Sequence, residues 1–213
     1  MEASYWHEKW AAQQIGFHQS EPHKHLVQFH SALDLKPDER VFVPLCGKTN
    51  DIGWLLNQGC AVCGVELNES AVHALFDSLA IAPEIDDVHS LKRYRHKNLQ
   101  VFVGDIFSMT RQDVGPVHAI YDRAALVALP PEMRNRYTKH LRSITNNAQQ
   151  LLITFDYDQN VMAGPPHSVP AKEVHEHYKP YYKLQLLAEE VVSGGLKKTT
   201  PATELAWHLD AIR

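Results

Sequence analysis

The stretch Val41–Leu56, VFVPLCGKTNDIGWLL, predicts a buried strand that leads through a turn with one glycine into a helix. A second apolar run, GCAVCGVEL, follows and places Glu66 nineteen residues after Gly47. A strand, a short turn, a helix and an acid at the tip of the next strand are typical of nucleoside-cofactor sites. A carboxylate has two acceptor oxygens, so Glu66 can accept hydrogen bonds from both hydroxyls of a ribose.

The glycine content of this turn argues against two other kinds of nucleotide site. A P-loop needs G-x-x-x-x-G-K-[ST], and although GKT at 47–49 supplies its end, Phe42 stands where the first glycine is required. A dinucleotide site needs G-x-G-x-x-G, whereas the next glycine after Gly47 is Gly53. A cofactor with a ribose but no phosphate fits this turn better, and S-adenosylmethionine is such a cofactor.

Apolar runs and helical patterns alternate along the rest of the chain. We expect strands at 40–45, 60–66, 99–104, 117–122 and 150–156, and helices at 4–14, 22–35, 50–58, 68–80 and 131–147. Near the carboxyl terminus, PYYKLQLLAEEVV and TPATELAWHLDAI predict two long strands joined through the turn at 193–195. We interpret the polar, irregular stretch 81–97 as an insertion.

These elements predict an α/β protein of the Rossmann-like type. We expect a mixed seven-stranded sheet with helices on both faces, closed by an antiparallel hairpin. A chain of 213 residues suits a single domain, 1–213, in which 1–37 form a helical cap over the ligand edge of the sheet.

Polar residues follow the strands at the edge where such sheets bind ligands, outside their carboxyl ends. The Leu45–Gly47 main chain would lie beside the methionine part of the cofactor, and Glu66 would hold the ribose. Asp105 and the backbone of Ile106 would meet the amino edge of the adenine, and Arg123 could pair with the cofactor carboxylate. Each has a structural alternative, because Glu66 and Asp105 can cap helices and Arg123 can form an exposed ion pair.

Composition and charge exclude several classes of protein. The net charge of -4 and the pI near 6.4 argue against a nucleic-acid binder. The sequence has no apolar stretch of the ~18 residues that a membrane span needs, and its start, MEASYWHEKW, lacks the features of a secretion signal. We therefore expect a cytoplasmic protein, a monomer, that binds neither nucleic acid nor membranes.

The cysteines do not indicate a metal or redox site. Cys60 and Cys63 form C-x-x-C, but residues three apart on a strand point to opposite faces, and no second Cys/His pair has matching spacing. We expect no bound metal.

The sequence resembles the thiopurine S-methyltransferases, class I S-adenosylmethionine-dependent enzymes, of the bacterial type, along nearly its whole length. The matching blocks are W-x-x-x-W (Trp6–Trp10), GFHQ (Gly16–Gln19), PLCGK (Pro44–Lys48), GVEL (Gly64–Leu67), GD-x-F (Gly104–Phe107), YDRAALVALP (Tyr121–Pro130) and GPP (Gly164–Pro166). PLCGK and DRAALVALP are specific to this family. The chain departs from it at Cys60, where relatives often carry histidine, and at PHKH, residues 22–25, near the acceptor side.

The resemblance implies a set of binding residues. The residues implied for the cofactor are Trp10, Leu45, Gly47, Glu66, Leu67, Asp105, Ile106 and Arg123. Phe17 would border the acceptor pocket, and together with Trp6 and Trp10 it could form a lid that excludes water.

The implied reaction moves a methyl group from S-adenosylmethionine to the sulfur of an aromatic or heterocyclic thiol, a small-molecule acceptor, and releases S-adenosylhomocysteine. Selenium and tellurium compounds are further possible acceptors. Such a displacement needs no side-chain nucleophile; His18 and Asp122 are candidates for a water-mediated base, and Arg123 could stabilise an anionic acceptor. An alternative is a non-catalytic domain of the same fold that binds the cofactor for regulation or sequestration.

Overall fold

The computed structural model describes residues 3–12, 16 and 18–212. The helices are α1 (Ala3–Ala11), α2 (Lys24–Phe29), α3 (Asn50–Asn57), α4 (Glu69–Ser78), α5 (Arg111–Val114), α6 (Pro131–Thr145) and α7 (Ala171–Tyr178), with 3-10 helices η1 (His30–Leu33), η2 (Ile106–Ser108) and η3 (Leu126–Ala128). The strands are β1 (Arg40–Val43), β2 (Ala61–Glu66), β3 (Glu84–Val88), β4 (Leu91–His96), β5 (Leu99–Val103), β6 (Ala119–Asp122), β7 (Gln149–Asp156), β8 (Tyr182–Val191) and β9 (Thr203–Ala211).

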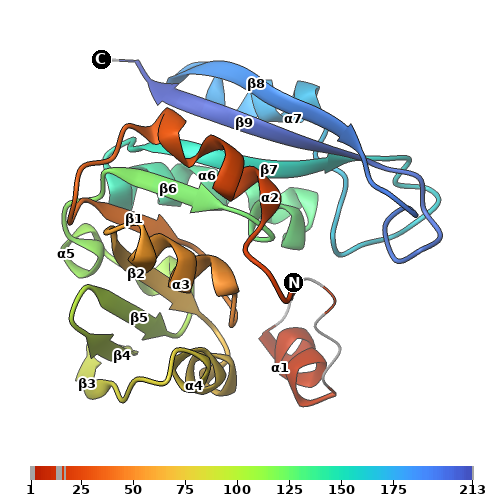
Figure 1. Cartoon of the computed structure of the whole chain (residues 1–213). Coiled ribbons are helices and arrows are strands. Elements are labelled where there is room, and N and C mark those ends of the chain that lie inside the picture. The colour runs from red at the N-terminus through yellow and green to blue at the C-terminus, as the bar shows by residue number, and fades with distance from the viewer. Residues whose placement is uncertain (1–2, 13–15, 17, 213) are drawn as a thin grey trace.

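The strands form one nine-stranded sheet in the described part of the chain, in the order β3-β4-β5-β2-β1-β6-β7-β9-β8 (Figure 1). The central strands from β5 to β7 are parallel, so their carboxyl ends share one edge of the sheet. The antiparallel hairpin predicted at the carboxyl terminus is confirmed: β9 pairs with both β7 and β8.

The predicted number of seven strands is wrong, because 81–97 contains the hairpin of β3 and β4 rather than an irregular insertion. This hairpin has few buried side chains, so it lacks the apolar alternation by which strands are recognised. Opposite charges face each other across it instead. Asp86 lies opposite Arg93, with Arg93 Nε donating to Asp86 Oδ1 at 3.0 Å, and Glu84 lies opposite Arg95 at 2.9 Å.

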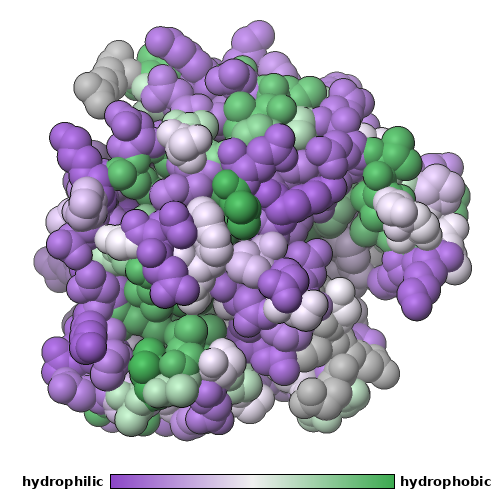
Figure 2. Space-filling model, in the orientation of Figure 1, coloured by the Kyte–Doolittle hydropathy of each residue, from purple (hydrophilic) through white to green (hydrophobic). Residues whose placement is uncertain are grey.

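Helices cover both faces of the sheet, as predicted. Buried residues of α2, η1, α3 and α4 pack on one face, and those of α5, α6 and α7 pack on the other. Cys60 and Cys63 lie in these two separate clusters, on opposite faces. The outer surface seen in Figure 2 is mostly hydrophilic, with small separate apolar patches.

The predicted cap over 1–37 divides into two parts with different roles. Leu26 of α2 and Leu33 of η1 are fully buried in the core and belong to the layer on the sheet face. Only α1 stands apart from both core clusters (Figure 1). The helical period alone does not separate a helix on the sheet face from one beyond its edge, so the sequence could not distinguish them.

Candidate functional site

A cavity of about 240 Å³ lies at the edge where the parallel strands end. Its wall is mainly apolar, with the carboxylates of two acidic residues, and comprises Trp6, Trp10, Leu45, Glu66, Leu67, Gly104, Asp105, Ile106, Phe107, Ala124, Ala128, Leu129, Met133 and Arg136. Apolar cavities with a few placed polar groups are the usual form of a small-molecule site. The structure therefore brings most of the predicted cofactor-binding residues together.

The turn after β1 brings its main chain close to this cavity. Leu45 has φ 46° and Gly47 has φ 54°, both in the left-handed region. A non-glycine residue there is strained by about 1–3 kcal/mol, and such strain gathers at binding sites. Hydrogen bonds hold the turn in place: Cys46 N donates to Val65 O at 3.0 Å, and Gly47 N donates to Glu66 Oε2 at 2.8 Å.

Glu66 ends β2 and is 6% exposed. Its Oε1 accepts from Asn68 N at 2.9 Å and its Oε2 from Gly47 N at 2.8 Å. Burial raises the pKa of Glu66, although the backbone donors oppose that shift. Because each carboxylate oxygen has further lone pairs, both can accept a ligand hydroxyl in addition. A vicinal diol fits this arrangement, and Glu66 lines the cavity as well as accepting these backbone hydrogen bonds.

The strand end after β5 forms another part of the wall. Asp105 accepts from Phe107 N at 2.9 Å and so caps η2, which is its predicted structural alternative. It also lines the cavity, next to the buried side chain of Ile106. The imidazole of His140 on α6 lies 2.8 Å from Ile106 O and fixes this segment from outside.

Helix α1 supplies the two tryptophans of the wall. Trp10 is 5% exposed, and both Trp6 and Trp10 line the cavity. His7 Nδ1 lies 3.3 Å from Asn68 Nδ2, which joins α1 to the residue that caps α4. Helix α1 is therefore a wall of the site rather than a detached cap.

Helix α6 contributes a wall of the cavity that was not among the predicted site residues. Met133 and Arg136 line the cavity, and the Arg136 guanidinium lies 3.8 Å from the centre of the Phe107 ring. The sequence contains one indication of this wall: Met133, Arg136 and His140 are three and four residues apart, so they share one face of the helix.

A second, much smaller cavity of about 10 Å³ adjoins the first, which is room for about one water molecule. Its lining consists of His18, Val43, Leu45, Cys46, Thr49, Asp51, Tyr121, Arg123 and Ala124. Leu45 and Ala124 belong to both cavities, and Ala124 also has a positive φ, 62°. The predicted residue Arg123 thus lies beside the main cavity rather than in its wall.

His18 enters this small cavity with a buried Nδ1, for which the described residues provide no hydrogen-bond partner. Burial, together with the charges of Lys48 and Arg123, lowers the pKa of His18. The imidazole is therefore neutral near pH 7 and can accept a proton there.

Asp122 lines neither cavity, and its predicted role as a base is not supported by its position. It is completely buried, and accepts from Tyr137 Oη at 2.7 Å and from Leu126 N at 3.0 Å. Side chains alternate along a strand, so the neighbour of Arg123 faces the core. The predicted acceptor residue Phe17 lies outside the described residues.

In residues 3–12, 16 and 18–212, no three His, Cys, Asp or Glu side chains are placed to hold a metal ion. Within the same ranges, no helix has the length and apolar character to cross a membrane.

Comparison with known proteins identifies relatives of the whole chain. The family model described as thiopurine S-methyltransferase matches residues 1–208. The thiopurine S-methyltransferase of Teredinibacter turnerae is 50% identical over 209 residues, covering 98% of this chain and 97% of the relative. That of Xanthobacter autotrophicus is 46% identical over 211 residues, covering 99% of both chains.

A solved structure supports the fold. A 1,6-didemethyltoxoflavin-N1-methyltransferase of Burkholderia thailandensis, with bound 1,6-didemethyltoxoflavin and S-adenosylhomocysteine, superimposes with a TM-score of 0.66. The match covers 98% of this chain and 87% of that one at 12% identity, so it carries the fold alone.

Proposed function

This chain belongs to the thiopurine S-methyltransferase family and is an S-adenosylmethionine-dependent methyltransferase, and we propose that its acceptors are aromatic and heterocyclic thiols. The observation that carries the proposal is the junction of the two cavities at Leu45 and Ala124, with Arg123 and His18 on the far side. A cytoplasmic location and a monomeric state stay predictions.

The main cavity suits the methyl donor. Glu66 would hold the ribose hydroxyls, and Asp105 and the backbone of Ile106 would meet the adenine amino edge. Leu45 and Leu67 supply apolar contacts beside them. The backbone N–H of Gly47 already donates to the Glu66 carboxylate, so we expect its role to be the orientation of that carboxylate. When bound, S-adenosylmethionine supplies a methyl group on a positively charged sulfur.

The acceptor would be held where the small cavity meets the large one. Arg123 is permanently cationic and favours a thiolate or another anionic group nearby. Attack of a thiolate on a sulfonium cancels two charges, so an environment with little water favours the reaction. Trp6 and Trp10 exclude water from one side, and their π faces suit a cationic sulfur.

Alignment can supply much of the catalysis, because a correct near-attack geometry is worth several kcal/mol. No nucleophile from the chain is needed, since the acceptor sulfur is the nucleophile. We expect acidic aromatic thiols to lose their proton without help, so that His18 is not needed as a base for them. The rate should then rise with pH up to the pKa of the acceptor thiol and level off above it.

The pH dependence distinguishes the acceptor's own ionisation from catalysis by His18. We expect His18→Ala to keep the wild-type pH profile for an aromatic thiol. Kinetics with two thiols of different pKa provide the measurement: the inflection should move with the thiol. An inflection that stays at the same pH for both thiols and disappears in His18→Ala would show instead that His18 is the base.

The acceptor class is tested by methyl transfer from isotopically labelled S-adenosylmethionine to a panel of aromatic thiols, selenols and tellurium oxyanions. Phenols of matched shape are the control, and we expect label in thiols and selenols but not in phenols. Arg123→Gln should lower kcat/KM for thiolates by about tenfold or more, while S-adenosylhomocysteine still binds. Methylation of phenols as fast as thiols would contradict the proposed acceptor class.

A further inference from the structure

The segment 18–23, which brings His18 to the small cavity, lies against the first turn of α3. Asn50 Nδ2 donates to Gln19 O at 2.8 Å and to Ser20 O at 2.9 Å. One residue further on, Asp51 Oδ1 accepts from His23 N at 2.7 Å. Two consecutive side chains of α3 thus hold this segment by three hydrogen bonds.

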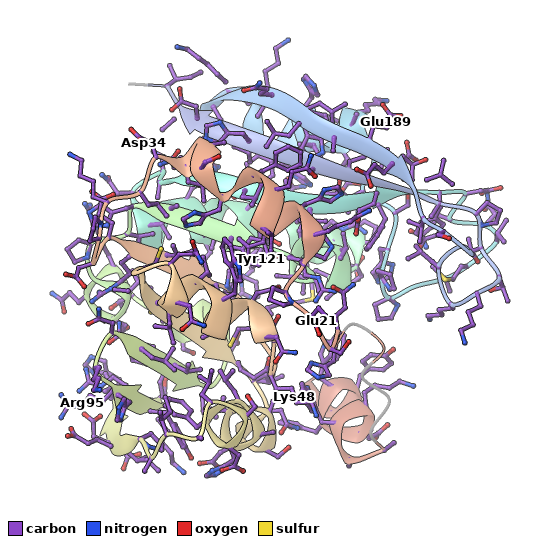
Figure 3. The ribbon with its side chains drawn as sticks, viewed as in Figure 1. Glu21, Asp34, Lys48, Arg95, Tyr121 and Glu189 are labelled. Atoms are coloured by element: carbon purple, nitrogen blue, oxygen red, sulfur yellow. The ribbon has the colours of Figure 1, made fainter. Side chains whose placement is uncertain are left out.

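The carboxylate of Asp51 also reaches β6, the strand that Arg123 directly follows. Its Oδ2 accepts from Tyr121 Oη at 3.1 Å, and both Asp51 and Tyr121 are almost completely buried. In Figure 3, Tyr121 lies in the interior between α2 and α3, and Glu21 and Lys48 lie on the side of α1. The same carboxylate is therefore in contact with both sides of the small cavity.

A first-turn acid is ordinarily explained by its interaction with the helix dipole, and Asp51 occupies such a position. That explanation requires neither burial nor long-range partners. A buried carboxylate is costly unless donors satisfy it, and here one donor comes from the segment 18–23 and the other from the end of β6. These two hydrogen bonds explain the buried carboxylate of Asp51 better than its interaction with the helix dipole does.

The segment is also fixed behind this contact. The rings of His23 and His25 each lie 3.2 Å from a carboxylate oxygen of Glu204 on β9. Lys24 Nζ lies 2.6 Å from Glu190 Oε2 on β8. Because these contacts hold residues 23–25 in place, the hydrogen bonds of Asn50 and Asp51 determine where residues 18–20 lie relative to the cavity.

We propose that Asn50 and Asp51 are positioning residues for the acceptor: they set the distance between His18 and Arg123 by holding the segment 18–23. The inference rests on the proposed thiol methylation for its kinetic readout. It concerns acceptor recognition and leaves cofactor affinity to the main cavity, which neither residue lines.

The informative variant is Asn50→Asp. It keeps the size of the side chain and suits the first turn of a helix, but replaces the donor to Gln19 O and Ser20 O by a carboxylate that repels both carbonyls. We expect KM for an aromatic thiol to rise about five- to tenfold, with a change below about twofold in the calorimetric Kd of S-adenosylhomocysteine. Asn57→Asp, at the exposed end of α3, has the same charge change and should leave both KM and Kd unchanged.

Amide hydrogen exchange gives a readout that does not depend on turnover. Exchange in 18–23 should be faster in Asn50→Asp than in the wild type and in Asn57→Asp. If no thiol is methylated by the wild type, the proposed function fails, and unchanged exchange in 18–23 would separately overturn the role of Asn50. With an active wild type, an unchanged KM, or a rise in KM matched by the same rise in Kd, would overturn the positioning role.

Discussion

Asp122 shows how one position along a strand separates a binding residue from a core residue. Its neighbour Arg123 reaches the small cavity, whereas the Asp122 carboxylate is enclosed with Tyr137. Burial raises the pKa of Asp122 to about 6, although its hydrogen-bond donors oppose the shift. In an unfolded chain the pKa of an aspartate is about 3.9.

This difference in pKa has a measurable effect on stability. Between about pH 4 and pH 6 the folded protein holds a proton that the unfolded chain has released, so this group makes the fold less stable as pH rises. From pH 4.5 to 7.5 the wild type should lose about 2 kcal/mol of unfolding free energy relative to Asp122→Asn. Urea unfolding at both pH values measures this, and parallel pH dependence in the two proteins would contradict the raised pKa.

At the scale of the element, α1 can be altered without disturbing the core, because it belongs to neither core cluster. Trp10→Ala removes a buried wall of the main cavity and should raise the Kd of S-adenosylhomocysteine by about tenfold, a loss of about 1.4 kcal/mol. The thermal midpoint should change by less than about 2 °C. Titration calorimetry and thermal unfolding provide the two measurements.

The matched control is Tyr5→Ala, which removes an aromatic ring from the same helix outside the cavity wall. Its Kd should stay within about twofold of the wild type. If Trp10→Ala binds S-adenosylhomocysteine as tightly as this control does, Trp10 only packs against the sheet edge.

The elements also show what sequence can and cannot predict. The strand before Gly47 and the acid at Glu66 were recognised because buried parallel strands are continuous apolar runs with polar ends. The hairpin at 84–96 was not recognised, because cross-strand charges rather than buried side chains accompany its pairing. The spacing of Met133, Arg136 and His140 shows that they share one face of α6, but what that face meets depends on contacts distant in sequence, and so does the position of the segment 18–23.

At the scale of the whole molecule, the amino-terminal segment and the last strand are joined. His23 and Glu204 are 181 residues apart in sequence, yet Nε2 and Oε1 lie 3.2 Å apart. Burial alone would raise the pKa of Glu204, but the hydrogen bond from His23 and the charges of His23, His25 and Lys24 outweigh it and lower the pKa. The carboxylate therefore stabilises the fold above its unfolded pKa, and that contribution is lost as the pH falls below it.

Glu204→Gln should lower the unfolding free energy at pH 7 by about 2 kcal/mol, because the buried His23 loses a charged hydrogen-bond partner and His25 loses a nearby carboxylate. Glu190→Gln is the control: its exposed carboxylate pairs with the exposed Lys24, and such ion pairs contribute little, so the unfolding free energy should stay close to the wild-type value. Urea unfolding of both variants is the measurement. Equal losses of unfolding free energy in the two variants would show that the buried carboxylate of Glu204 stabilises the fold no more than the exposed carboxylate of Glu190.

The position of β9 between β7 and β8 has a consequence for synthesis of the protein on the ribosome. Strand β8 is made before β9 and, among the described strands, pairs with β9 alone, so it has no partner until β9 has left the exit tunnel. Strand β9 also carries Glu204, so the contact between His23 and Glu204 forms only after β9 has been made. A nascent chain can form the central strands before β9 is made, and a chain that stops short of β9 leaves β8 exposed to aggregation.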